Sequence, residues 1–418
     1  RLLGPFVAPT DAALGRARDN CRAGTAWRHC DREAASIAAS AGELWAVTAA
    51  ALAGASLLAS PSSRSWARPA RVVRNRLRAA RRCAAGAATG AATDDSVRVV
   101  LGTMTFAGQT PLDEASWMLR RFTQLQGAGA EVDTARMYEH GATEAMLGEI
   151  FAGDAELRAA CAVASKANPF PTHDRALSAA SLRSQLSNSL RDLQASSVAI
   201  YYLHAPDRET PIEETLEVVN EAYCAGKFVE LGLSNYQSWE VAHIHALSRE
   251  RGWVLPTVYQ GMYNAITREV ERELFPCLRA LGLRFYAYNP LAGGLLTGKH
   301  SVDSLAICKE GRFRLSNEMY RSRFLAPAQI EASEIIKAAC AQEGEAPACA
   351  ALRWLARHSV LDVSRGDGII VGASTRSHFE ENLAALDTHE PLPGAMLEAF
   401  DRAWDSVRCA GCVPSYER

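Results

Sequence analysis

The chain has 418 residues, of which 48% are hydrophobic and 22% are charged, as in an ordinary globular protein. Its formal net charge of −2 gives no electrostatic reason to expect a nucleic-acid or membrane-surface partner. The 11 cysteines are odd in number and lack paired spacing, so the sequence predicts reduced thiols and not a disulfide framework.

Residues 1–95 differ in composition from the rest of the chain, since they are rich in alanine and arginine. Trp45 to Ser60 is an apolar run about as long as the core of a signal peptide and too short for a typical transmembrane helix. Pro61 to Gly90 contains eight arginines and no acidic residue, which is the composition of an organelle transit peptide. We therefore expect residues 1–95 to be a targeting extension and residues 96–418 to form the folded domain.

An apolar segment followed by a basic one suits a two-part import signal. Such a signal would direct the protein to a plastid or mitochondrion, and without it we expect a cytoplasmic location. The alternative is that residues 1–95 are low-complexity sequence without a targeting signal. Residue 1 is arginine, so we also expect the start of the chain to be a fragment or a processed end.

Short β-branched or aromatic runs recur from Val97 onward, and each precedes a longer amphipathic stretch. Near-continuous apolar strands that alternate with helices indicate a parallel sheet covered by helices. Eight such units in about 300 residues fit a closed α/β barrel, the (β/α)8 or TIM barrel. The predicted strands are Val97–Leu101, Ala130–Val132, Cys161–Ser165, Val198–Leu203, Phe228–Leu233, Thr257–Tyr259, Arg284–Tyr288 and Gly368–Val371.

Apolar residues at a spacing of three and four predict helices over Pro111–Gln126 and Leu177–Leu193. A third helix begins at Pro211 and ends at Gly226. A doubly wound open sheet is the alternative fold, but no G-x-G-x-x-G follows the first strand. A long insert at residues 300–327 follows the seventh strand, and we expect an insert at that place to carry function.

Polar residues occur where the predicted strands end, and in a barrel these ends form the catalytic rim. The second strand ends in Asp133, with Tyr138 on the following loop, the third ends in Lys166 and the fourth in His204. Each residue alone has a structural explanation as a turn cap, a packed aromatic or a solvated loop lysine. Their coincidence at one rim favours a site. The later strands end in Ser234 and Asn235, Gln260, Asn289, and Gly372 to Ser374.

Asp, Tyr, Lys and His at one rim predict a site that donates a proton. A free phenol has a pKa of about 10 and is a poor acid at neutral pH. A nearby ammonium group stabilises the phenolate, so we expect Lys166 to lower the pKa of Tyr138. A neutral histidine would hydrogen-bond a carbonyl oxygen. The set contains no nucleophile–base pair, and we see no spacing that predicts metal ligands.

The region from about residue 97 to residue 418 resembles the aldo-keto reductases, especially the branch of aflatoxin-aldehyde and succinic-semialdehyde reductases. The voltage-gated potassium channel β subunits are more distant relatives. The resemblance implies an enzyme that reduces an aldehyde with NADPH, which becomes NADP+. It leaves open an NADPH-binding regulatory subunit with little turnover. The matching segments lie in order along the barrel: LGTMTFAG, DTARMYEHGATEAMLG, SKANP, YYLHAPD, ELGLSNY, YQGMYNAITR, YAYNPLAGGLLTGK, ALRWLARHS and GASTRSHFEENL.

By this resemblance Tyr138 is the general acid, Lys166 lowers its pKa, Asp133 supports Lys166, and His204 orients the carbonyl group. The resemblance implies a substrate set of His204, Tyr320, Arg323 and Arg418, in which the arginines face an anionic group. The expected substrates are semialdehydes and dicarbonyls. The residues implied to bind NADPH are Ser234, Asn235, Gln260, Tyr288, Asn289, Pro290, Leu291, Gly293, Gly294, Lys299, Arg312, Ser374, His378 and Asn382.

The chain departs from the family pattern in two places. Many members carry Lys and Arg in the last segment, where this chain has Gly372 and His378, so the strength of the preference for NADPH over NADH stays open. Arg376 is a candidate for the 2′-phosphate. The second departure is the loop 135–137 before Tyr138, where we expect substrate specificity to have changed.

A rival interpretation comes from residues 293–300, which match the G-x-x-x-x-G-K pattern of a phosphate-binding loop. The eighth position is His300, so the hydroxyl that would bind Mg²⁺ in a nucleotidase is missing. We therefore expect a small-molecule aldehyde as the partner, with no nucleic acid and no membrane insertion of the barrel. The sequence leaves open whether two copies form a homodimer.

Overall fold

The computed structural model describes residues 96–170, 175–301, 304, 307–309 and 311–411. The predictions made for residues 1–95 and for Arg418 lie outside the described residues. Within these ranges no helix combines the length and the apolar character that crossing a membrane requires.

Eight parallel strands close into a barrel in chain order, and the last strand pairs with the first. The predicted (β/α)8 barrel is therefore confirmed, and each predicted strand is present to within three residues at either end. The strands run longer than predicted at Lys166, Ser234 and Gln260, which continue the pairing where the sequence predicted its end. The strands are β1 (Arg98–Gly102), β2 (Ala130–Asp133), β3 (Cys161–Ala167), β4 (Val198–Leu203), β5 (Phe228–Ser234), β6 (Pro256–Met262), β7 (Arg284–Tyr288) and β8 (Gly368–Val371).

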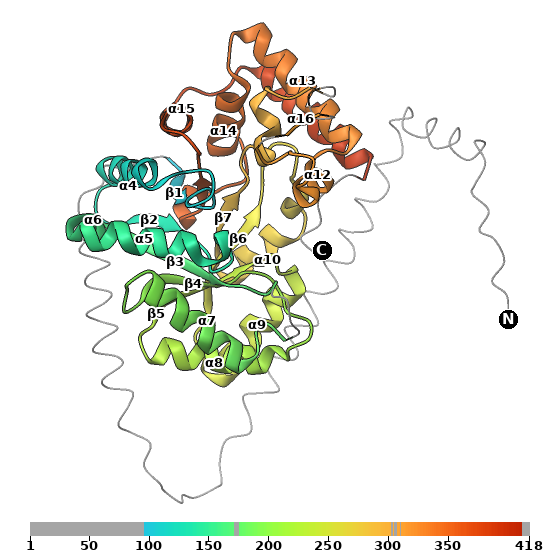
Figure 1. Ribbon diagram of the computed structural model, residues 1–418. Helices are drawn as coiled ribbons and strands as arrows, with labels where there is room; N and C mark the ends of the chain where they lie inside the picture. Colours follow the sequence, from blue (N-terminus) through green and yellow to red (C-terminus); the bar gives the residue numbers. More distant parts are fainter. Residues whose placement is uncertain (1–95, 171–174, 302–303, 305–306, 310, 412–418) are drawn as a thin grey trace, which may run out of the picture. The chain divides into compact units, whose positions relative to one another are not determined.

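Helices surround the strands (Figure 1). The first of them, α4, buries an apolar stripe with Met118, Leu119 and Phe122. The predicted helices after β1, β3 and β4 are α4, α7 and α8. The described helices are α4 (Leu112–Gln126), α5 (Ala142–Gly153), α6 (Ala155–Ala160), α7 (Ala179–Asp192), α8 (Ile212–Cys224), α9 (Ser238–Arg251), α10 (Leu274–Leu281), α12 (Glu318–Phe324), α13 (Pro327–Glu343), α14 (Pro347–Arg357), α15 (Arg376–Asp387) and α16 (Gly394–Cys409).

In the part of the chain that the structure describes, four short 3₁₀ helices lie in the connections between these elements. They are η1 (Tyr138–Gly141), η2 (Glu269–Glu271), η3 (Ala292–Thr297) and η4 (Val363–Arg365). Two of them lie in loops that follow strands at the carboxyl rim, η1 after β2 and η3 after β7. The predicted insert after β7 contains α12, which buries Tyr320 and Phe324.

A small apolar cluster is separate from the main core and is built from alternate strand residues. Tyr202 is its largest member together with Tyr286, and it is almost fully buried. Gly232 on the neighbouring strand makes room for the Tyr202 ring, since a Cβ atom at Gly232 would overlap that ring. Large side chains therefore fill this part of the barrel, as is general for the fold. The cluster consists of Val100, Ala164, Ile200, Tyr202, Val258, Tyr286 and Ile370.

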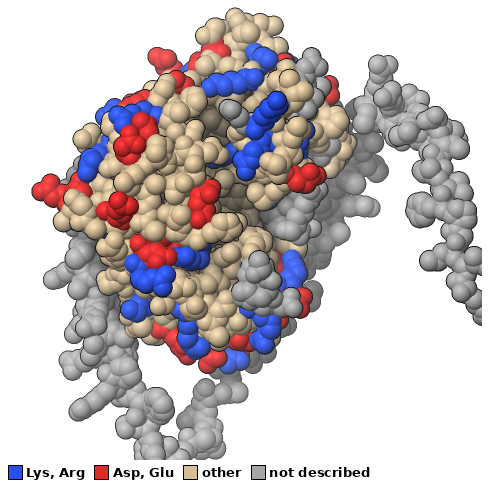
Figure 2. Space-filling view, in the orientation of Figure 1, with Lys and Arg blue, Asp and Glu red and all other residues tan. Residues whose placement is uncertain are grey.

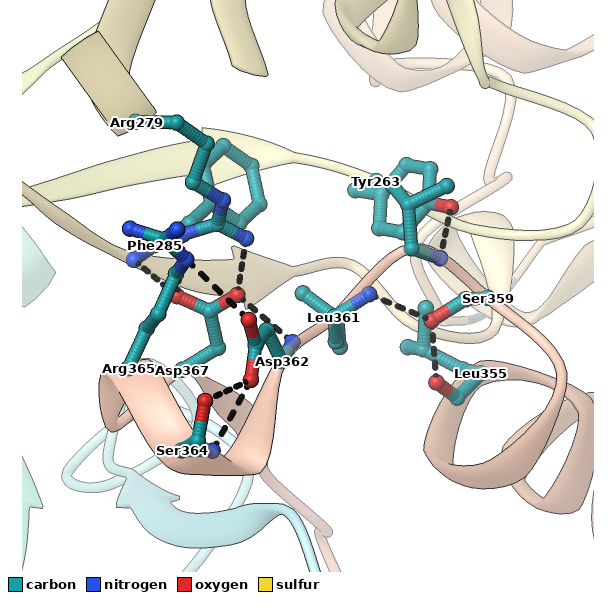
Figure 3. A network of polar contacts seen from close by, with 11 residues as sticks. Tyr263, Arg279, Phe285, Leu355, Ser359, Leu361, Asp362, Ser364, Arg365 and Asp367 are labelled. Carbon is teal, nitrogen blue, oxygen red and sulfur yellow. Dashed lines mark hydrogen bonds and ion pairs between the residues drawn. The ribbon is translucent and has the colours of Figure 1, made fainter. Parts of the chain in front are cut away.

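A buried carboxylate, Asp367, joins the loop before β8 to the start of β7 (Figure 3). Its Oδ1 accepts a hydrogen bond from the backbone N–H of Phe285 at 2.7 Å and one from Arg279 Nη1 at 2.9 Å. Its Oδ2 accepts the backbone N–H of Asp362 at 2.8 Å. The side chain is fully shielded from solvent, so it depends on these partners for charge compensation.

Replacing Asp367 by alanine is expected to destabilise the barrel by about 3–5 kcal/mol, because the partly buried Arg279 and the backbone N–H groups of Phe285 and Asp362 would all lose their acceptor. Urea unfolding followed by circular dichroism would measure the change. Asp362→Ala is the matched control, since this more exposed carboxylate caps η4 in the same loop, and its loss should cost about 1 kcal/mol. Equal unfolding midpoints for the two variants would contradict the prediction.

Candidate active site

Three of the four predicted catalytic side chains meet at the carboxyl end of the barrel. Lys166 Nζ lies 2.6 Å from Asp133 Oδ2 and 3.2 Å from Tyr138 Oη. It also donates to the backbone carbonyl of Thr134 at 2.9 Å. Since the ammonium group donates to the phenol oxygen, the phenolic hydrogen is free to point into the neighbouring cavity.

Burial is the main influence on the pKa values of Tyr138 and Lys166. It raises the pKa of Tyr138 well above its usual value, the charge of Asp133 acts in the same direction, and Arg312 opposes them. The net direction of the Tyr138 pKa is therefore upward in this structure, and a lowering by Lys166 stays a prediction. Burial also lowers the pKa of Lys166, while the carboxylates of Asp133 and Glu144 act to raise it. Tyr138 is thus held as the protonated phenol at neutral pH.

His204 lies between two aromatic rings at the end of β4. Its ring makes edge contacts with Tyr138 at 6.1 Å and with Phe170 at 6.2 Å between centroids. Burial lowers the pKa of His204 well below its usual value, and the charge of Lys166 adds to this effect. The imidazole is therefore neutral at neutral pH, and one of its nitrogens can donate a hydrogen bond to an oxygen in the cavity.

The amide side chains at the rim form a second layer of contacts. Gln260 Nε2 donates to Asp133 Oδ1 at 2.8 Å, so this residue also fixes the carboxylate that pairs with Lys166. Asn235 Nδ2 donates to the backbone oxygen of His204 at 2.8 Å, and Asn235 Oδ1 accepts from Tyr288 Oη at 2.7 Å. Asn235 has a φ of 61°, which turns the chain sharply after β5.

A cavity of 780 Å³ opens at this rim, large enough for a ligand of cofactor size. The face drawn in Figure 2 is hollowed near its centre, with acidic and basic side chains interspersed over it. Lys166 and Ser234 lie behind the cavity wall, where Ser234 Oγ accepts from Asn235. The predicted site residues that line the cavity are Asp133, Tyr138, His204, Asn235, Gln260, Tyr288, Asn289, Pro290, Leu291, Gly293, Gly294, Lys299, Arg312, Tyr320, Arg323, Ser374, His378 and Asn382.

Two arginines line the cavity from the insert after β7. Arg312 Nη1 lies 3.5 Å from Asn289 Oδ1, and its guanidinium group lies 5.5 Å from the centre of the Tyr320 ring. Burial raises the pKa of Tyr288 to about 12, and the charge of Arg323 opposes this rise. The insert therefore brings positive charge to the cavity.

Apolar side chains that the sequence did not single out also line the wall: Met104, Phe170 and Met319. Phe170 is 56% exposed and Met319 is 53% exposed, so both stand at the mouth of the cavity. Among the described residues no group of three or more His, Cys, Asp or Glu side chains could hold a metal ion.

Two arginines that the sequence singled out, Arg376 and Arg136, lie outside the cavity lining. Arg376 does not line the cavity: its Nε lies 2.9 Å from Glu114 Oε1 on α4, and its guanidinium group stacks on Trp117. In the loop 135–137 only Met137 lines the cavity, because the Arg136 side chain is turned away toward Glu144. The cation that does line the cavity beside α15 is Lys299, whose Nζ lies 2.9 Å from His378 Nε2.

The family model for the aldo/keto reductases matches residues 98–405, which is the whole barrel. The chain belongs to the aldo/keto reductase family. Aflatoxin B1 aldehyde reductase member 2 of Mus musculus is 47% identical over 326 residues, which are 76% of this chain and 87% of the relative. The Homo sapiens member 2 is 46% identical over 329 residues (77% and 90%), and the Homo sapiens member 4 is 43% identical over 316 residues (73% and 93%).

These relatives place the reductase in the aflatoxin aldehyde reductase branch of the family, and its activity is that of an oxidoreductase enzyme. Their names correspond to the branch indicated by the motifs of the sequence. The phosphate-loop interpretation of residues 293–300 is set aside, because this segment forms η3 in the wall of the reductase cavity.

Proposed function

We propose that the reductase uses NADPH to reduce aldehydes that carry a negative charge, with Tyr138 as the general acid. The observation that carries this proposal is the contact of 3.2 Å between Lys166 Nζ and Tyr138 Oη beside the cavity. Bound NADPH would supply the hydride. His204 would donate a hydrogen bond to the carbonyl oxygen, and Tyr138 would transfer its proton to that oxygen as it becomes an alcohol.

The donor set of the cavity fits a nicotinamide dinucleotide. Asn235 and Gln260 offer amide groups near Tyr138, where a carboxamide would find both donors and acceptors. Tyr288 offers an aromatic ring, and Arg312 offers a cation to phosphate oxygens. Lys299 supplies positive charge next to His378 on α15, which supports NADPH over NADH.

A regulatory protein that binds NADPH with little turnover is the second candidate. The same barrel serves enzymes and binding proteins, so the fold does not separate them. The proximity of Asp133, Lys166 and Tyr138, with His204 in ring contact, favours the enzyme, because a protein that only binds the cofactor does not need a proton donor.

A steady-state assay of the purified protein tests the proposal. Loss of NADPH absorbance would be followed with a set of aldehydes, half of which carry a carboxylate, and the set would be repeated with NADH. We expect turnover with NADPH, a lower kcat/KM with NADH, and a preference for the carboxylates. Tight NADPH binding without turnover of any aldehyde would support the regulatory candidate.

Replacing Arg323 by methionine is expected to raise the KM for a carboxylate-bearing aldehyde about 10-fold to 100-fold, since a hydrogen bond to a charged group contributes about 1.5–3 kcal/mol. The KM for an uncharged aldehyde of equal length should stay the same. The control is Arg314→Met, which removes an exposed arginine from the same insert outside the cavity. An unchanged KM for the carboxylate in Arg323→Met would remove the anion site from the proposal.

A further inference from the structure

A buried group of polar and charged side chains lies behind the loop that carries Tyr138. We call it the Arg136 cluster: Arg136, Glu144, Ser165 and Asp192. Arg136 Nη1 donates to Glu144 Oε2 at 2.7 Å and to Asp192 Oδ2 at 2.6 Å, and Ser165 Oγ donates to Glu144 Oε1 at 2.6 Å. Glu144 has no exposed side-chain surface, and Arg136 and Asp192 are 19% and 17% exposed, so solvent screens these contacts little.

The cluster joins four parts of the barrel: the loop after β2, the start of α5, strand β3, and the end of α7. The chain leaves room for the arginine at Gly141, where a Cβ atom would overlap Arg136 Nη2. Gly141 has a φ of 96°, which an L side chain rarely adopts. The packing of α5 is therefore fitted to the guanidinium group.

The backbone beside Arg136 is tied to the catalytic strand. The Arg136 N–H donates to the carbonyl of Lys166 at 3.2 Å, and the Thr134 N–H donates to the carbonyl of Ala164 at 3.0 Å. On the other side of Tyr138 the chain passes through Glu139 and His140, whose φ values of 44° and 55° belong to the left-handed region. Such a loop needs tertiary contacts to keep one conformation, and the Arg136 side chain provides them.

Strand β3 carries both the cluster and the catalytic lysine. Successive side chains of a strand point to opposite faces, so Ser165 reaches Glu144 on one side of the barrel wall while Lys166 reaches Asp133 on the other. A shift of the cluster would therefore move the loop of Tyr138 and the strand of Lys166 relative to each other.

We propose that the Arg136 cluster positions Tyr138 against Lys166, and that Arg136, Glu144 and Asp192 are positioning residues for the proton transfer. The inference rests on the proposed function, because it assigns the cluster to the reaction in which Tyr138 is the acid. No cluster residue lines the cavity, so the cluster acts through the loop and the strand and not on the substrate. A misplacement of about 1 Å is enough to cost a reaction about 100-fold in rate.

The test compares Arg136→Met with Arg136→Lys, which keeps the charge but holds one contact fewer. Arg183→Met is the control, since Arg183 lies on α7 as Asp192 does and its ion pair with Glu221 is exposed. Each variant would be measured for kcat and KM, for the NADPH dissociation constant, and for hydrogen exchange of residues 133–141 without added ligands.

We expect Arg136→Met to lower kcat about 10-fold to 100-fold, to leave the NADPH dissociation constant within about 2-fold, and to speed hydrogen exchange in residues 133–141. Arg136→Lys should recover part of the kcat, and Arg183→Met should match the wild type. If Arg136→Met does not fold, Asp192→Asn removes one contact of the arginine and should give smaller changes of the same kind.

The inference is overturned if Arg136→Met keeps the wild-type kcat, or if kcat falls while exchange of residues 133–141 is unchanged. It is also overturned if Arg183→Met loses as much kcat as Arg136→Met. A wild-type protein that turns over no aldehyde with NADPH would refute the proposed function instead. In that case the exchange of residues 133–141 alone decides whether the cluster holds the loop.

Discussion

Replacing Tyr138 by phenylalanine is expected to lower kcat for aldehyde reduction by about 100-fold to 10,000-fold, the range that a positioned general acid contributes. The variant loses only the hydroxyl, while Lys166 keeps its contacts with Asp133 and with the carbonyl of Thr134. We therefore expect the protein to fold normally. The loss should appear in kcat and in kcat/KM alike, because the proton is transferred in the transition state.

The control for Tyr138→Phe is cofactor affinity, measured by the quenching of protein fluorescence on addition of NADPH. An unchanged dissociation constant together with a lost kcat would assign the hydroxyl to the chemical step. Turnover retained at the wild-type rate would exclude Tyr138 as the acid.

The expected pH dependence of aldehyde reduction follows from the pKa values of Tyr138 and His204. Burial raises the pKa of Tyr138 and lowers that of His204, so neither changes its protonation state near neutral pH. Reduction by the wild type, which needs the phenol protonated, should therefore change little between about pH 6 and pH 8. The reverse oxidation of an alcohol needs the phenolate and should become faster as the pH rises.

Replacing Lys166 by methionine is expected to destabilise the protein by about 3–5 kcal/mol and also to remove most of the activity. Lys166 is fully buried and pairs with Asp133 at 2.6 Å, so its loss leaves a carboxylate without its cation in the barrel. The phenol of Tyr138 also loses the donor at its oxygen. Urea unfolding and the steady-state assay would measure the two effects separately.

The double variant Asp133→Asn, Lys166→Met separates charge burial from catalysis. Removing both charges should recover most of the stability, because no unpaired ion is left. It should not recover kcat. Lys337→Met, which removes an exposed lysine, serves as the control and should change stability by no more than about 0.5 kcal/mol. A double variant no more stable than the single one would contradict the charge-burial argument.

The barrel could be predicted from the sequence because its strands are short apolar runs separated by helical patterns. The predicted strands end too early at Lys166, Ser234 and Gln260, because polar residues are typical of loops. Here two of these side chains stay inside the barrel, where Asp133 pairs with both Lys166 and Gln260. Such pairing depends on strands that neighbour each other only after the barrel closes.

The direction of the Tyr138 pKa could not be predicted from neighbours in the sequence. A nearby ammonium group lowers the pKa of a phenol, but the effect of burial depends on how much of the cavity wall covers the hydroxyl. The contacts of Arg136 could not be predicted from the sequence for a related reason. Its partner Asp192 is distant in sequence and approaches only when α7 packs against the barrel.

The aromatic side chains that fill the barrel bear on how Tyr138 would be reprotonated after each proposed proton transfer. The ring of Tyr202 lies 5.8 Å from Lys166 Nζ, and with Tyr286 it belongs to the cluster that fills this part of the barrel. These rings fill the barrel beside Lys166, so in the proposed reaction the proton that Tyr138 gives up would be replaced from the cavity. Substrate entry, alcohol release and reprotonation of Tyr138 would then share this cavity, so the alcohol would have to leave before the next proton is delivered.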